Sequence, residues 1–99
     1  MTEILKERYR RIRGMILRIL IKWHPAPLEL DEIHAFLDDL SYSITKEELC
    51  SHLAYLEEPG YIKIESRKAD GVEIKKIKIM KKGMDIVDGF GKDVGIIRL

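Results

Sequence analysis

Residues 44–65, Ile-Thr-Lys-Glu-Glu-Leu-Cys-Ser-His-Leu-Ala-Tyr-Leu-Glu-Glu-Pro-Gly-Tyr-Ile-Lys-Ile-Glu, place a capped helix directly before a strand. Thr45 and Glu48 have the spacing of a capping box, in which each side chain bonds the other residue's free backbone N–H. Three leucines recur at helical spacing and give the helix one apolar face: Leu49, Leu53 and Leu56. The Pro59-Gly60 pair ends the helix. The apolar period then falls to two, which predicts a strand from Tyr61 to Glu65.

Two further helices are predicted upstream. Glu3 to His24 carry an apolar stripe at steps of three and four, formed by Leu5, Tyr9, Ile12, Ile16, Ile19 and Trp23. Asp31 to Leu40 form a shorter helix, whose inward side chains should be Ile33, Phe36, Leu37 and Leu40. A short turn over residues 41–43 joins it to the helix that starts after Thr45. Two short helices joined in this way make a helix-turn-helix.

Downstream, the Asp70-Gly71 pair predicts a tight hairpin turn. The return strand should run from Val72 to Ile79. Ile74 and Ile77 are three residues apart, which breaks the alternation. Either a bulge near residues 75–76 or a solvent-facing Ile74 would account for the break.

The last part of the chain predicts one more helix and a docked tail. Lys81 to Asp88 can form a short helix, with Met84 and Val87 as core contacts. Glycines at 89 and 91 end it. Residues 94–99, Val-Gly-Ile-Ile-Arg-Leu, are apolar for a terminal segment, so we expect them to pack on the domain.

This order of elements, from Leu5 to Asp88, resembles that of winged-helix proteins. The joint Leu-Glu-Glu-Pro-Gly-Tyr-Ile at 56–62 is similar to the junction between the third helix and the wing, and residues 79–88 resemble the segment after the wing in many winged-helix regulators. The segment 82–89 and the closing Gly-Ile at 95–96 are also similar to small winged-helix proteins of phages and prophages. The resemblance implies an α+β fold in one domain, residues 1–99, with a three-helix core, a two-stranded β-hairpin wing and a short C-terminal helix.

Charge is unevenly distributed along these 99 residues, although the net charge is only +1. Residues 1–22 hold seven Lys or Arg and two acids, residues 29–58 hold one Lys and nine acids, and residues 63–82 hold eight bases and three acids. An acidic middle therefore lies between two basic segments, which bears on the choice of partner.

Composition predicts a cytoplasmic protein. Cys50 is the single cysteine, so no internal disulfide can form. The apolar run over residues 15–23 is too short for a membrane span and contains Arg18 and Lys22. The chain has no Asn or Gln and is rich in Ile, Lys and Glu, a composition typical of thermophilic proteins.

An enzyme, a metal site and a cofactor site are not expected. The only candidate ligands or nucleophiles of the His and Cys types are His24, His34, Cys50 and His52, whose spacing fits no known metal motif. The glycines follow no phosphate-loop pattern. Paired acids such as Glu47 and Glu48 are adjacent in sequence and point in different directions along a helix.

The winged-helix resemblance implies DNA binding of the transcriptional-regulator type, with the third helix in the major groove. The outward face of that helix, however, carries Glu47, Ser51, Ala54, Tyr55 and Glu58, and Lys46 is its only base. The candidate DNA-binding residues are Lys46, Ser51, Tyr55, Arg67, Lys68, Lys75, Lys76, Arg10 and Arg13. The alternative is a winged-helix module used for protein contact, in which the acidic helix-turn-helix meets a basic partner. The lysine-rich segments could also be a plain solvated surface.

A second apolar stripe on the helix over residues 3–24 predicts a homodimer. Gly14, Leu17 and Ile21 lie opposite the core face. If Leu17 and Ile21 stayed in water, the favourable free energy of burying two aliphatic side chains would be lost. Two covers are available, namely the apolar tail of the same chain or the same helix of a second chain. We predict a two-fold dimer to which the tail contributes. The predicted interface residues are Gly14, Leu17, Ile21, Ile96, Ile97 and Leu99.

Overall fold

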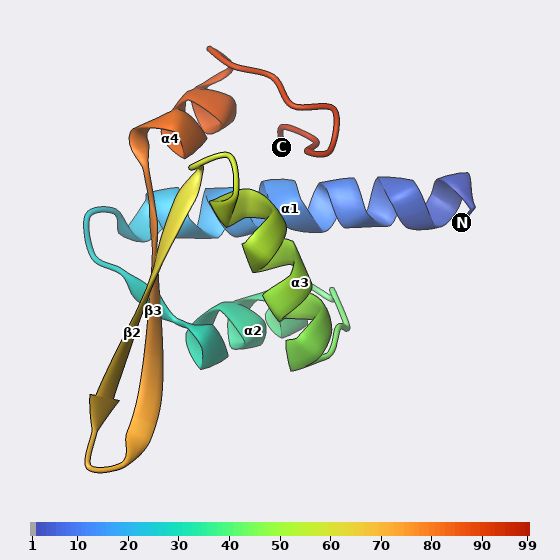
Figure 1. Cartoon of the computed structure of the whole chain (residues 1–99). Helices are drawn as coiled ribbons and strands as arrows, with labels where there is room; N and C mark the ends of the chain where they lie inside the picture. The colour runs from blue at the N-terminus through green and yellow to red at the C-terminus, as the bar shows by residue number, and fades with distance from the viewer. Residues whose placement is uncertain (1) are drawn as a thin grey trace.

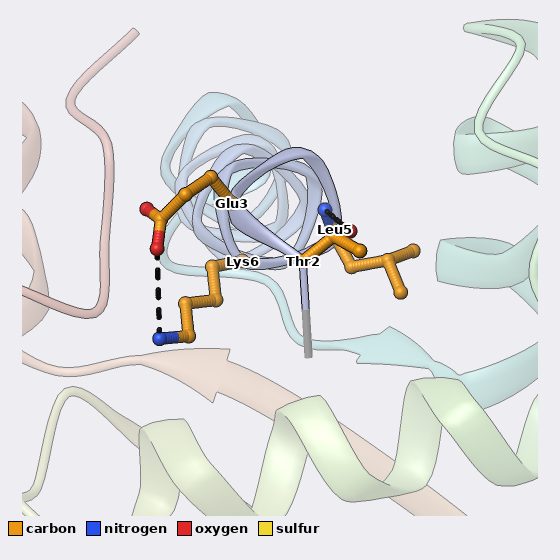
Figure 2. Close-up of polar contacts among 4 residues, drawn as sticks. All are labelled: Thr2, Glu3, Leu5 and Lys6. Carbon is orange, nitrogen blue, oxygen red and sulfur yellow. Dashed lines mark hydrogen bonds and ion pairs between the residues drawn. The ribbon is translucent and has the colours of Figure 1, made fainter.

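The longest element of the described chain, residues 2–99, is helix α1 (Glu3–Trp23), seen here in a computed structural model. Thr2 caps it, since its Oγ1 accepts a hydrogen bond from the backbone N–H of Leu5 at 3.3 Å. Glu3 and Lys6 form an ion pair at 3.8 Å beside this cap (Figure 2). Both charges are exposed, so the pair adds at most about 1 kcal/mol. The helix thus starts where the sequence predicts and ends one residue early.

The predicted core stripe of α1 is buried only in its middle. Ile12 and Ile16 are fully buried, whereas Leu5 and Trp23 are 41% and 46% exposed. The prediction of a core position is therefore wrong for these two residues. They lie near the two ends of the 21-residue helix, whose N-terminal end extends past the other helices (Figure 1).

Helices α2 (Leu30–Asp39) and α3 (Lys46–Glu57) pack on α1. The capping box before α3 is confirmed, because the Glu48 N–H donates to Thr45 Oγ1 at 3.0 Å and the Thr45 N–H donates to Glu48 Oε1 at 3.4 Å. The three leucines of α3 are buried as predicted. Leu40, predicted to face inward, is 48% exposed, because α2 ends at Asp39 and Leu40 lies beyond its last turn.

The sheet has three antiparallel strands in the order β1 (Leu28–Glu29), β3 (Val72–Ile79), β2 (Ile62–Ala69). β2 and β3 form the predicted hairpin, which is longer than expected on the β2 side. Both turn residues have positive φ, 53° at Asp70 and 75° at Gly71, as a tight hairpin requires. Strand β1 was not predicted, because two residues carry no periodicity.

The register of β2 and β3 is continuous from Ile62 opposite Ile79 to Ala69 opposite Val72. A bulge near residues 75–76 is therefore absent, and the second explanation holds: Ile74 lies on the face opposite Ile77 and is only half-buried. The inner half of the hairpin packs on the helices, while its tip extends past them as an exposed arm (Figure 1).

Helix α4 (Lys81–Asp88) has the predicted bounds. Its buried positions are Gly83 and Ile86, while Met84 and Val87 are half-buried at the edge of the core. A side chain at position 83 would overlap the carbonyl oxygen of Tyr61, so only glycine allows this approach of helix to strand. The described chain is thus α+β, with four helices and a three-stranded antiparallel sheet (Figure 1).

The tail returns along α1 (Figure 1) and covers Gly14 and Leu17 of the second stripe. The backbone N–H of Ile97 donates to the carbonyl oxygen of Arg10 at 3.0 Å, and Ile96 is 6% exposed. Leu17 is fully buried, and Gly14 lies directly against the Ile97 backbone. Of the two predicted covers, the structure therefore has the tail of the same chain. The predicted dimer interface at Gly14 and Leu17 is already occupied within one molecule.

Replacing Gly14 with Ala should undock the tail. The new methyl group would overlap the carbonyl oxygen of Ile97, and the burial of Ile96 would be lost. We expect a net loss of about 1 to 2 kcal/mol, because Ala favours the helix by about 1 kcal/mol over Gly and so offsets part of the cost. Hydrogen exchange at the Ile97 amide should accelerate strongly. The exposed Arg11→Ala change is the control, and unchanged protection of Ile97 in Gly14→Ala would contradict the prediction.

Candidate nucleic-acid interface

The hairpin β2–β3 presents a row of cations on one face. Alternation along the strands and the pairing of Lys63 with Lys78, Glu65 with Lys76 and Arg67 with Ile74 set these residues on the side opposite the core. We call the four cations of this side the basic hairpin face: Lys63, Arg67, Lys76 and Lys78. Lys78 is half-buried and the others are exposed.

The predicted cations Lys68 and Lys75 lie on the other face of the hairpin, opposite Glu73 and Ser66. The prediction treated Lys75 and Lys76 as one group, but adjacent strand residues point to opposite sides. The same alternation places Lys63, which is not among the predicted DNA-binding residues, on the basic hairpin face. Its position directly opposite Lys78 could have been read from the hairpin turn, because a two-residue turn fixes the register.

Acids neutralise this face only in part. Glu65 Oε1 lies 3.5 Å from Lys63 Nζ, and Glu29 of β1 is paired with Lys76 across the strands. Among residues 2–99, no carboxylate lies within 4.0 Å of the charged nitrogens of Arg67, Lys76 or Lys78. Two like charges directly opposite each other, as at Lys63 and Lys78, destabilise a sheet unless another charge offsets them. The hairpin therefore carries excess positive charge at a solvent-exposed site.

The outward face of α3 offers no comparable site. Lys46 Nζ forms an ion pair with Asp31 Oδ1 at 2.9 Å, and Ser51 Oγ donates to the Glu47 carbonyl oxygen at 3.3 Å. Exposed glutamates at 47, 48, 57 and 58 surround them. A phosphate approaching α3 would meet mostly negative charge.

Three arginines of α1 hold the tail, and Tyr55 lies against one of them. Three guanidinium groups donate to backbone carbonyl oxygens: Arg10 Nε to Val94 at 2.7 Å, Arg13 Nη1 to Gly95 at 3.2 Å, and Arg18 Nη1 to Leu99 at 3.0 Å. The Arg13 guanidinium also lies 3.7 Å from the centre of the Tyr55 ring. Arg10 and Arg13, two of the predicted DNA-binding residues, thus use donors to hold the docked tail, and their contact with DNA stays a prediction.

A buried polar cluster secures the same region. His52 is 5% exposed, and its Nδ1 accepts a hydrogen bond from Arg13 Nε at 3.2 Å. Burial first, and then the nearby Arg13 charge, lower the pKa of His52 from 6.5 to about 4, against the opposing effect of Glu48. His52 is thus neutral near pH 7. The sequence did not reveal this role, since nothing pairs positions 13 and 52 before the helices pack.

Tyr61 and Asp93 fix the start of the tail. Tyr61 Oη donates to Asp93 Oδ2 at 2.6 Å, and the Gly95 N–H donates to Asp93 Oδ1 at 2.8 Å. The Tyr61 hydrogen bond lowers the pKa of Asp93, and the Gly95 bond acts in the same direction against desolvation. Burial, followed by this hydrogen bond and the Asp93 charge, raises the pKa of Tyr61 to about 12. Both groups keep their charge states across neutral pH and act as structural ties.

Residues 2–99 contain no group of three or more His, Cys, Asp or Glu side chains placed to hold a metal ion. Within the same residues, no helix has the length and apolar character needed to cross a membrane. No family model matches the chain, and no curated protein matches it either.

Proposed function

We propose that this chain is a winged-helix domain of regulatory type that binds duplex DNA through the hairpin β2–β3. The order of three helices, hairpin and fourth helix supports the winged-helix assignment, with β1 as the short third strand of the sheet. The basic hairpin face is the observation that carries the proposal. It joins excess positive charge to an arm that extends past the helices (Figure 1).

Binding through the hairpin differs from the mode implied by the resemblance, in which the third helix reads bases. Here α3 is acidic, and its one lysine is paired with Asp31. Lysines and arginines that track a phosphate backbone give affinity without sequence readout. The proposed contact is therefore dominated by phosphates, with Arg67 near the hairpin tip as the group best placed to enter a minor groove.

Titration of a labelled duplex at several salt concentrations tests this mode. The proposal predicts affinity that falls steeply as salt rises, because each lysine–phosphate contact releases counterions. Lys76→Gln combined with Lys78→Gln should weaken binding to all duplexes and reduce the slope of log K against log salt by about 2. Lys6→Gln with Lys92→Gln, two exposed lysines outside the hairpin, is the matched control and should leave the slope unchanged. Failure of the wild-type chain to form a complex with any duplex at low salt would refute the proposal.

A second candidate function is protein binding by the acidic helices. Eight acids on and just beyond the ends of α2 and α3 are exposed: Asp31, Glu32, Asp38, Asp39, Glu47, Glu48, Glu57 and Glu58. Lys46 is the only base among them and is already paired with Asp31. A basic partner would complement this surface. If duplex DNA does not bind, loss of partner binding in Glu47→Gln with Glu58→Gln would favour this function.

A further inference from the structure

An apolar groove of about 540 Å³ lies beside the C-terminal half of α1, between α2 and α4. Seven apolar side chains line it, six from the three helices and one, Leu40, just beyond the end of α2: Met15, Ile19, Ile21, Trp23, Phe36, Leu40 and Val87. Trp23 and Leu40 are nearly half exposed, and the Trp23 ring stacks on Phe36 with 6.0 Å between ring centres. Large apolar groups gathered around a groove are unusual on a small monomer and mark interaction sites.

The tail does not cover this groove. Its residues pack on the Gly14 and Leu17 side of α1, where Ile97 bonds Arg10, and none of them lines the groove. Ile21 is therefore the one member of the predicted dimer stripe that the tail leaves accessible, and it belongs to the groove instead.

Charged side chains line the groove in equal numbers of each sign. Arg18 and Lys22 extend from α1, while Asp39 and Asp88 come from the ends of α2 and α4. Within residues 2–99, none of the four has an oppositely charged side chain within 4.0 Å. Arg18 uses one N–H to hold Leu99 and has further donors to offer. A surface of zero net charge, on which two cations and two anions have no salt bridge to another side chain, is complementary to a second copy of itself.

We infer that a second copy of this chain docks in the groove, forming a two-fold dimer. In such a pair the same patch is used twice, so each contact between two different residues occurs twice. The two-fold places Arg18 and Lys22 of one copy against Asp39 and Asp88 of the other and covers Trp23 and Leu40 in both. A strongly basic partner would place its cations opposite Arg18 and Lys22, and a strongly acidic partner would place its anions opposite Asp39 and Asp88. Either repulsion would weaken binding. This inference does not depend on DNA binding.

Trp23 provides a direct readout, because it is the only tryptophan in the chain. On raising the protein concentration, light scattering should approach twice the 11.6 kDa chain mass, and the Trp23 emission should shift to the blue over the same range. A mass that stays at 11.6 kDa would overturn the inference. A dimer that forms with no change in Trp23 emission would overturn it as well, since the contact would then lie elsewhere.

Charge exchange between copies tests the pairing itself. Lys22→Glu gives the rim a net negative charge and Asp39→Lys a net positive one, so each variant alone should be monomeric. Both positions are exposed, and circular dichroism should show an unchanged fold. Mixing the two variants should restore a dimer, with one copy of each. The control Lys92→Glu, outside the groove, should dimerise like the wild type. A dimeric Lys22→Glu variant, or monomers after mixing, would contradict the proposed arrangement.

Discussion

Replacing Ile16 with Ala should lower the free energy of unfolding by about 2 to 5 kcal/mol, among the largest effects we expect from a single change. Ile16 is fully buried at the centre of α1, which packs against α2, α3, β3 and α4. Removing three carbon atoms there leaves a cavity that rigid elements on several sides cannot close. The shift should appear in chemical denaturation as a lower midpoint with an unchanged slope.

A graded series separates packing from helix propensity. Ile16→Val removes one methylene and should cost only about 0.5 to 1.5 kcal/mol. Ile4→Ala makes the same chemical change in the same helix at a position that is 80% exposed, so its effect should be within about 0.5 kcal/mol of zero. Leu53→Ala in α3, 2% exposed, should match Ile16→Ala. Equal effects at positions 4 and 16 would show that Ile16 is not a core residue.

Acidification should destabilise the fold through His52. Its pKa is about 4 in the folded chain and about 6.5 when unfolded, so between these values the unfolded chain binds the additional proton. The contribution of His52 is complete above pH 6.5 and is lost as the pH falls toward 4. One proton gives a slope of up to about 1.4 kcal/mol per pH unit, and the whole window amounts to about 3 kcal/mol.

His52→Gln should remove this part of the pH dependence, since Gln can accept the Arg13 hydrogen bond but does not titrate. His24→Gln, at an exposed position, should retain it. The pKa of Asp93 is also lowered in the folded chain, but its unfolded value is 3.8. The contribution of Asp93 to stability is therefore lost at a lower pH than that of His52. An NMR titration that places the His52 pKa near 6.5 would contradict the prediction.

Local signals in the sequence predicted most of the elements. The Thr45 and Glu48 cap, the Asp70-Gly71 turn and the bounds of α4 depend on residues within a few positions of one another, and all three are confirmed. The α+β class follows from these elements. That the domain is a winged helix stays a proposal, because the chain matches no family model.

Features set by contacts between distant residues could not be predicted. On a helical wheel, Arg10 and Arg13 look like solvated cations. In the structure they donate hydrogen bonds to carbonyl oxygens of the tail, which lies more than 80 residues later in the chain. The same holds for the two-residue strand β1, which exists only because β3 lies beside it. For the hairpin, the sequence predicts the cations, but only the strand register shows that Lys75 and Lys76 lie on opposite faces.

The docked tail also constrains how the chain can fold during its synthesis. The arginine contacts join residues 81 to 84 positions apart, so α1 leaves the ribosome long before its cover exists. At about 5 to 20 residues per second, those positions take roughly 4 to 17 s to translate. For that interval Leu17 faces water or a chaperone, and the nascent chain cannot close its final contact. Completion of the domain is therefore a step that follows synthesis of its last residues.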